Sequence, residues 1–156
     1  SGSFDPEVVF FLMDRGLAPE RIRAMVNRES GLLGLSGMDS HYKIIEEKAR
    51  SGDRAARLAS DVLVNRITCL IGGYCAEMGG VDAIVFTGGI GENSAYLRRE
   101  VLSHFGYLGL VLDDAANGAN AEIITAPGSA VRGLVIPANE ELQIAREVAE
   151  ALEEGN

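Results

Sequence analysis

Tryptophan is absent from this chain, and the aromatic side chains that remain make up only 6% of it. The core must therefore be built mostly from aliphatic residues. A hydrophobic content of 47% still favours a folded globule over a disordered chain. The length of 156 residues corresponds to one domain with enough chain for a substantial core.

Basic residues are also few, with 14 lysines and arginines against 23 acidic residues and a formal net charge of −9. This excess of negative charge argues against nucleic acid or an anionic membrane surface as a partner. It does not exclude a nucleotide, because a few backbone N–H groups and a metal ion are enough to hold a phosphate.

Only two cysteines occur, Cys69 and Cys75, and they form neither a Cys-x-x-Cys motif nor a zinc-binding cluster with histidine. Two thiols without a disulfide framework are typical of a reducing compartment, so we expect a cytoplasmic protein. The longest apolar stretch, from Ile67 to Met78, is interrupted by two glycines and a glutamate. It is too short to span a membrane, and no signal peptide opens the sequence.

Hydrophobic periodicity and capping residues predict a helix-rich chain with a few short strands. Helices are expected from Pro6 to Gly16, from Pro19 to Gly31, from Asp39 or Ser40 to Ala49, from about Asp53 to Met78, from Ser94 to about His104, and after Asn139. Strands are expected over Ala83–Phe86, Leu108–Leu112, Glu122–Thr125 and Arg132–Ile136. The order of these elements indicates an α/β fold with a parallel core.

Two further expectations concern single segments. The stretch from Gly31 to Gly37 carries three glycines without a helical period, which predicts a loop. In the last helix the apolar side chains are expected to face inward, and they are Leu142, Ile144, Ala145, Val148 and Leu152.

The stretch around which the chain is organised runs from Ala83 to Ser94. Ala83–Phe86 is continuously apolar, which suits a strand buried on both faces. Three glycines follow within four residues, and Asn93 or Ser94 can cap the next helix. The main-chain N–H groups available to an anion there belong to Gly88, Gly89, Ile90 and Gly91.

Spacing alone leaves the function of this glycine segment open between a phosphate loop and a tight turn without a ligand. Ser94 stands where a Gly-x-Gly-x-x-Gly motif needs its third glycine, so a dinucleotide fold is disfavoured. No Gly-Lys-Ser/Thr follows, so the segment is not a Walker A loop either.

Four stretches, taken in order, resemble the acetate and propionate kinases of the acetokinase family. They are Ser1–Pro6, Glu29–Gly37, Phe86–Ser94 and Ile136–Leu142, of which Phe86–Ser94 is similar to the nucleotide-loop signature of that family. The resemblance extends over nearly all of residues 1–156 but covers only the C-terminal portion of such a kinase, well under half of one. It implies a C-terminal nucleotide-binding domain of a two-domain kinase whose N-terminal domain is missing.

The fold implied by this resemblance is one half of an actin-like ATPase or sugar-kinase-like (ribonuclease H-like) fold, rich in helix and with a small mixed sheet. The implied activity of the parent enzyme is reversible, Mg²⁺-dependent transfer of a phosphoryl group from ATP to acetate, which gives acetyl phosphate and ADP. A propionate kinase domain and a non-catalytic module for nucleotide binding or dimerisation are the alternatives. The resemblance also implies a homodimer formed through this domain.

Site residues follow from the same resemblance. Gly88, Gly89, Ile90 and Gly91 would hold nucleotide phosphates or let the adenosine lie against bare backbone, and Asn93 would bond to ribose or phosphate, although a role as helix cap competes. Glu140 would place Mg²⁺, through water. Without the resemblance, its position at a helix start favours a role as partner for the helix dipole instead.

One place departs from the family pattern. Related kinases usually show Ser-Asp-x-Arg, whose Asp and Arg flank the nucleotide base, where this chain has Ser40-His41-Tyr42-Lys43. Lys43 lacks the flat guanidinium that stacks on a base, so His41 or Tyr42 would have to stack instead. The preference for adenine is therefore left open. The choice between acetate and propionate is left open for another reason, because the family's carboxylate pocket belongs mainly to its N-terminal portion.

The family places the residues around the transferred phosphate mainly in its N-terminal portion, and this sequence shows no dense Arg, His and Asp cluster that would replace them. We therefore expect no catalytic residue within the chain and no useful phosphoryl transfer by the chain alone.

Overall fold

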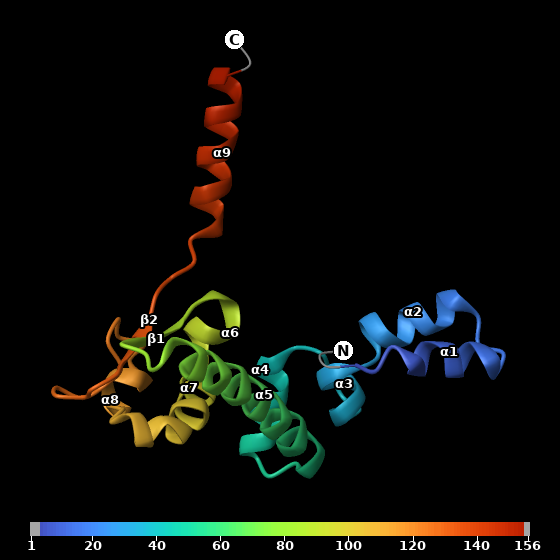
Figure 1. The fold of residues 1–156 in the computed structure, drawn as a ribbon, viewed down its shortest axis with the longest axis horizontal. Helices are drawn as coiled ribbons and strands as arrows, with labels where there is room; N and C mark the ends of the chain where they lie inside the picture. The colour runs from blue at the N-terminus through green and yellow to red at the C-terminus, as the bar shows by residue number, and fades with distance from the viewer. Residues whose placement is uncertain (1–3, 155–156) are drawn as a thin grey trace. The chain divides into compact units, whose positions relative to one another are not determined.

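The computed structural model describes residues 4–154, so the first three residues of the Ser1–Pro6 stretch lie outside the described part. The fold is α/β, rich in helix and with a small sheet, which confirms the expected fold class (Figure 1). The chain divides into two compact units, with the boundary between Ala76 and Glu77.

The N-terminal unit consists of helices. They are α1 (Glu7–Asp14), α2 (Pro19–Arg28), α3 (Gly31–Ser36), α4 (Tyr42–Arg50) and most of α5 (Arg54–Met78). Pro19 occupies the first turn of α2, where its fixed φ suits a helix and its missing N–H costs nothing. Buried apolar side chains come from three of these helices and include Ile22, Tyr42, Ile45, Ala49, Ala56, Ala59 and Val64.

The C-terminal unit contains the sheet. Its elements are β1 (Ala83–Phe86), α6 (Gly88–Asn93), α7 (Ala95–Leu102), the 3₁₀ helix η1 (Ser103–Leu108), α8 (Asp114–Gly118), β2 (Arg132–Val135) and α9 (Glu140–Glu154). β1 and β2 pair in parallel, with Ala83 opposite Arg132 and Phe86 opposite Val135. The buried apolar core of this unit includes Ile84, Phe86, Leu97, Val101, Leu102, Phe105, Leu110, Ile124 and Val135.

Ser94 is the cap that separates α6 from α7. Its Oγ accepts a hydrogen bond from the N–H of Leu97 at 3.0 Å, and the side chain is buried. This satisfies one of the donors that a helix start leaves unpaired. Of the two candidate caps, Asn93 and Ser94, the structure therefore assigns the role to Ser94.

The segment from Gly31 to Gly37 is a short helix, α3, and the expected loop is wrong. Gly31 and Gly37 have φ angles of +66° and +67°, so they lie at the two ends of the helix rather than inside it. The N–H of Gly37 donates to the carbonyl of Leu33 at 2.7 Å, which closes the last turn. The number of glycines alone does not show whether they interrupt a helix or end it, and for this reason the sequence did not indicate α3.

The expected strands around residues 108–125 are also reduced. Leu112 pairs with Thr125 and Ile123 with Leu134 only as isolated antiparallel bridges. β1 is not buried on both faces either, because Val85 is 50% exposed. One face of β1 is therefore partly accessible to solvent in the part of the chain that the structure describes.

The expectation for the last helix is not met: the apolar side chains of α9 are exposed, with Ile144 61% and Leu152 67% accessible to solvent. A helical period shows which side chains share a face but not whether another element covers it. Between residues 4 and 154, no helix combines the length and the apolar content that crossing a bilayer requires.

Candidate functional site

The three glycines of the central segment have three different environments. Gly88 has a φ of +69°, a conformation that side-chain-bearing residues rarely adopt. A Cβ on Gly91 would lie 3.3 Å from the carbonyl carbon of Phe86, so this glycine lets α6 pack closely on the end of β1. A Cβ on Gly89 would meet nothing within 4 Å. Gly88 and Gly91 are therefore needed by the fold itself, whereas the bare backbone at Gly89 is open to a ligand.

The side chain of Glu92 is directed toward the first residue of its own helix, α6. Its Oε1 accepts a hydrogen bond from the N–H of Gly88 at 2.7 Å and another from the N–H of Ala138 at 2.9 Å. The expected turn is thus a helix, α6, whose first N–H is already paired with a carboxylate of the same chain. A phosphate cannot use the N–H of Gly88 while Glu92 holds it.

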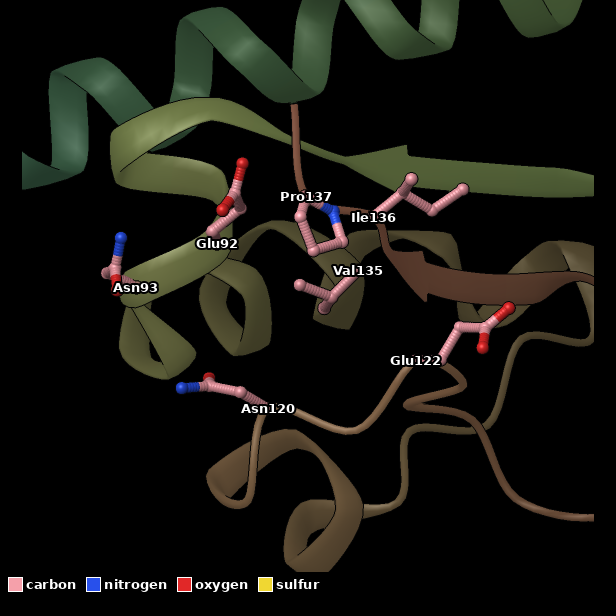
Figure 2. A pocket seen from close by; sticks show the side chains of 7 residues that line it. All are labelled: Glu92, Asn93, Asn120, Glu122, Val135, Ile136 and Pro137. Carbon is pink, nitrogen blue, oxygen red and sulfur yellow. The ribbon is translucent and has the colours of Figure 1, made fainter. Parts of the chain in front are cut away.

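A hollow of about 440 Å³ adjoins this segment and lies within the C-terminal unit (Figure 2). Its lining residues are Glu92, Asn93, Asn120, Glu122, Val135, Ile136 and Pro137. The volume is within the range of small-molecule sites. Apolar side chains from the end of β2 and two amide and two carboxylate groups share the wall, so the hollow suits a flat or sugar-like group with hydrogen-bond donors better than a bare anion.

Asn93 lines this hollow and is exposed to solvent. Its Nδ2 donates to the carbonyl of Gly89 at 2.8 Å. This bond fixes the direction of the amide, and within residues 4–154 its Oδ1 accepts no hydrogen bond. The amide oxygen is thereby presented as an acceptor for a hydroxyl or amino group of a ligand.

The side chain of Arg98 connects α6 to the segment of residues 117–120. Its guanidinium is fully buried and donates from Nη1 to the carbonyls of Gly91 and Glu92, each at 2.8 Å. On the other side it donates from Nε and Nη2 to the side chain and carbonyl of Asn117, each at 2.8 Å, and from Nη2 to Oδ1 of Asn120 at 2.6 Å.

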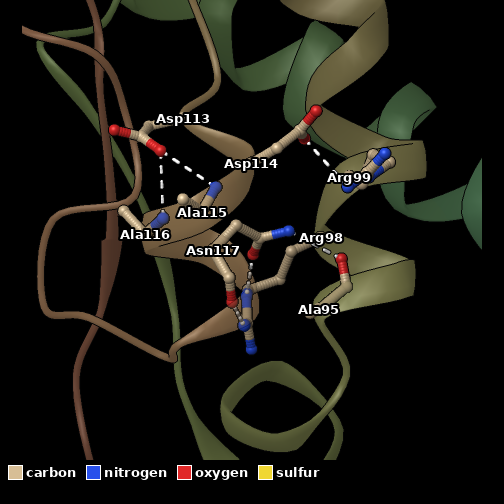
Figure 3. Close-up of polar contacts among 8 residues, drawn as sticks. All are labelled: Ala95, Arg98, Arg99, Asp113, Asp114, Ala115, Ala116 and Asn117. Atoms are coloured by element: carbon tan, nitrogen blue, oxygen red, sulfur yellow. Dashed lines mark hydrogen bonds and ion pairs between the residues drawn. The ribbon is translucent and has the colours of Figure 1, made fainter.

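Figure 3 shows this guanidinium against Asn117, whose own Nδ2 donates to the carbonyl of Ala95 at 2.8 Å. The acceptor carbonyls lie at the C-terminal ends of α6 and α8, where helices carry partial negative charge. A permanently charged side chain is therefore stabilised in a buried place, and it fixes α6 against the segment that bears Asn120.

The three residues that were expected to meet the base lie in the N-terminal unit, around the start of α4. His41 is exposed, and its N–H donates to Oδ1 of Asp39 at 2.8 Å while its Nδ1 lies 2.7 Å from the same oxygen. These hydrogen bonds hold the pKa of Asp39 below its usual value, and the bond from the backbone N–H of His41 contributes most to the shift. Lys43 is exposed as well.

Tyr42, in contrast, is only 4% exposed, and its hydroxyl lies 3.0 Å from Oγ of Ser60 in α5. Its ring is part of the core of the N-terminal unit and offers no face to a base. The sequence contains a signal for this burial. Tyr42, Ile45 and Ala49 are spaced so that they share one face of α4, and all three are buried.

Glu140, the expected metal residue, is the first residue of α9 and is exposed. Among residues 4–154, no three or more histidine, cysteine, aspartate or glutamate side chains come together as a metal site would require. A lone carboxylate still fits Mg²⁺, because this ion commonly keeps several waters and takes its other oxygens from substrate phosphates.

Sequence reasoning gave no role to Glu92, Arg98, Asn120 or Glu122. For Glu92 the signal was its position four residues after Gly88, which matters only once the segment is known to be helical. For Arg98 the signal was its helical spacing from Val101, Leu102 and Phe105, which are all buried. Asn120 and Glu122 carried no local signal, because only the tertiary fold brings them to the hollow.

The sequence matches the family model of the Acetokinase family over residues 1–146. An acetate kinase of Fervidobacterium nodosum is 47% identical over 99% of this chain and 39% of its own length. A propionate kinase of Citrobacter rodentium is 45% identical over 95% of this chain and 37% of its own. The crystal structure of Porphyromonas gingivalis acetate kinase superposes with a TM-score of 0.85 at 38% identity, over 97% of this chain and 39% of that one.

The chain thus spans about two fifths of the length of the curated relatives it matches. The family match covers far more than half of the chain, and the similarity extends from sequence to fold. The chain belongs to the acetokinase family.

Proposed function

We propose that this chain is the C-terminal nucleotide-binding domain of an acetate kinase, and that the parent enzyme transfers a phosphoryl group reversibly from ATP to acetate, giving acetyl phosphate and ADP. The observation that carries the proposal is the position of the segment Phe86–Ser94, whose residues Glu92 and Asn93 line a hollow of ligand size. Membership of the family supports the proposed reaction class, and the hollow supports the proposed binding site for one substrate.

The chemistry of the hollow favours the nucleoside end of the nucleotide. Two carboxylates, Glu92 and Glu122, stand in its wall, and they would repel phosphate groups brought close without a metal ion. The amide oxygen of Asn93 and the bare backbone at Gly89 suit ribose hydroxyls and a flat base, while the amide oxygen of Asn120 is already held by Arg98. Of the remaining expected residues, Ile90 and Gly91 adjoin this wall in α6, while His41 and Lys43 stay proposals for contact with the base.

Mg²⁺ bound with the nucleotide would neutralise charge on the phosphates during transfer, and Glu140 is the residue proposed to hold it, through water. The groups that surround the moving phosphate are proposed to lie in the remainder of the parent enzyme. The parent is further proposed to be a cytoplasmic homodimer. Cys69 and Cys75 are free thiols, which is consistent with a reducing compartment.

A second candidate is the corresponding domain of a propionate kinase. The observation in its favour is that a relative named propionate kinase is 45% identical to this chain, close to the value for the acetate kinase. Comparing acetate with propionate as phosphoryl acceptor for the parent enzyme decides between the two carboxylates. A module that binds nucleotide without belonging to an active enzyme is the third reading, and an inactive parent would support it.

Nucleotide binding is tested by titrating the chain with ADP in the presence of MgCl₂ in a calorimeter. Asn93→Ala removes the proposed acceptor for the nucleoside, and we expect it to weaken ADP binding about tenfold, which corresponds to one hydrogen bond of about 1.4 kcal/mol.

The matched control for Asn93→Ala is Asn65→Ala, an exposed asparagine on α5. It should leave the affinity unchanged. If the unaltered chain takes up no ADP, or if both variants bind equally well, the proposed function of this hollow is wrong.

The chain alone is expected to form no acetyl phosphate above background from ATP and acetate. Phosphoryl transfer depends on cations and metal arranged around the moving group, and the sequence shows no such cluster. A hydroxamate assay of the purified chain measures this, with an active acetate kinase as the positive control. Acetyl phosphate formation that scales with the concentration of the chain would contradict the expectation.

A further inference from the structure

One oxygen atom of Glu92 accepts hydrogen bonds from its own helix and from Ala138, which lies 46 residues further along the sequence. Oε1 accepts from the N–H of Gly88 at 2.7 Å and from the N–H of Ala138 at 2.9 Å. In Figure 2 the side chain of Glu92 extends from α6 toward the segment that bears Pro137. A hydrogen bond to a charged acceptor is roughly twice as strong as one between neutral groups, so this contact holds both segments firmly.

The two donors belong to parts of the chain with different proposed tasks. Gly88 is the first residue of α6, whose residues Glu92 and Asn93 line the hollow. Ala138 lies in the connector of residues 137–139, between the end of β2 and the start of α9 at Glu140. Just before this connector, the N–H of Ile136 donates to the carbonyl of Phe86 at 2.9 Å and continues the sheet pairing.

Beyond Ile136 the direction of the chain changes. Proline at 137 has no N–H to donate, and Asn139 adopts a φ of +50°, outside the usual range for a residue with a side chain. The bond from Ala138 to Glu92 therefore fixes the connector at the point where it leaves the sheet. Glu140, the proposed Mg²⁺ residue, is two positions further on.

We propose that Glu92 is a positioning residue that couples occupation of the hollow to the placement of the connector and of Glu140. A ligand against the glycine segment changes the freedom of α6, and the shared carboxylate oxygen passes that change to Ala138 because both N–H groups bind the same atom. The coupling rests on the proposed nucleotide site. It adds that the nucleoside wall and the metal residue are linked through one side chain.

The test measures amide hydrogen exchange by NMR at Gly88, at Ala138 and at residues 89–93, in the whole chain with and without MgADP. Three variants are compared with the unaltered chain. Glu92→Ala removes the acceptor, Glu92→Gln keeps its shape without its charge, and Glu147→Ala removes an exposed carboxylate of α9 as the control.

In the free chain, Glu92→Ala is expected to speed exchange at both Gly88 and Ala138 at least tenfold, with Glu92→Gln between the two and Glu147→Ala unchanged. MgADP is expected to slow exchange at residues 89–93 and at Ala138 in the unaltered chain at least threefold. In Glu92→Ala, the slowing should persist at residues 89–93 and disappear at Ala138.

Each opposite result overturns the proposal in a distinguishable way. If Glu92→Ala leaves exchange at Ala138 unchanged in the free chain, the carboxylate does not hold the connector. If MgADP protects residues 89–93 but never Ala138 in the unaltered chain, the coupling is wrong while the nucleotide site stands. If MgADP protects neither segment, the nucleotide site fails, and the coupling fails with it.

Discussion

Replacing Arg98 with methionine is expected to lower the free energy of unfolding of the C-terminal unit by about 3–5 kcal/mol. The substitution keeps much of the side-chain volume but removes the charge and every N–H donor. It removes the donors to partly buried carbonyls of Gly91 and Glu92 and to buried oxygens of Asn117, and it releases Asn120 from the wall of the hollow. Urea unfolding followed through the NMR signals of residues 83–135 measures the loss.

The neighbouring arginine provides the control. Arg99 is half exposed and forms a 3.0 Å ion pair with Asp114, which is exposed as well (Figure 3). Arg99→Met should cost less than about 1 kcal/mol, because exposed ion pairs are weak. Arg98→Lys should fall between the two, since an ammonium offers three donors from one point instead of five from a planar fork. Equal losses in the two methionine variants would show that Arg98 has no special structural role.

Exchanging the glycines of α6 for alanine is expected to separate stability from binding. Gly91→Ala should destabilise the C-terminal unit by about 1–3 kcal/mol, because the new Cβ would press on the backbone of Phe86 at 3.3 Å and force α6 away from β1. Gly89→Ala should leave stability unchanged or raise it by up to about 1 kcal/mol, since alanine favours a helix. Urea unfolding with the same NMR probes compares the two variants.

The two glycine substitutions should affect MgADP binding in the opposite order to their effects on stability. Gly89→Ala places a methyl group on the open backbone beside the hollow, and we expect it to weaken MgADP binding at least tenfold in a calorimetric titration. A variant that is as stable as the unaltered chain but binds normally would remove Gly89 from the proposed site. A Gly91→Ala chain of unchanged stability would contradict the packing role assigned to that glycine.

Several elements were predictable because their signals are local. The long helix α5 follows from apolar spacing, and it was expected to end at Met78, where the structure ends it. The position of β1 follows from a continuous apolar run bounded by a glycine segment. Ser94 was one of two candidate caps, and only a measured hydrogen bond to Leu97 decided between them.

Other features could not be predicted from local signals, because they depend on contacts with residues that are distant in the sequence. The glycine run from Gly31 to Gly37 could be a loop or a helix, and the outcome depends on which glycines take a positive φ. Tyr42 was a stacking candidate because it lies where the family pattern places the residues that flank the base, yet its burial against α5 makes it part of the core. The apolar face of α9 has the correct period for packing but is exposed.

The sequence by itself determined the family, the fold class and the stretch where a nucleotide is proposed to bind, because family signatures and hydrophobic periods are written in consecutive residues. The tertiary structure decided which parts of that stretch remain available. It paired the first N–H of α6 with Glu92, and it buried Arg98 between the ends of two helices. It also brought Asn120 and Glu122 to the hollow from a distant segment. Hydrogen bonds between distant segments depend on how the chain packs, and no local pattern of residues encodes them.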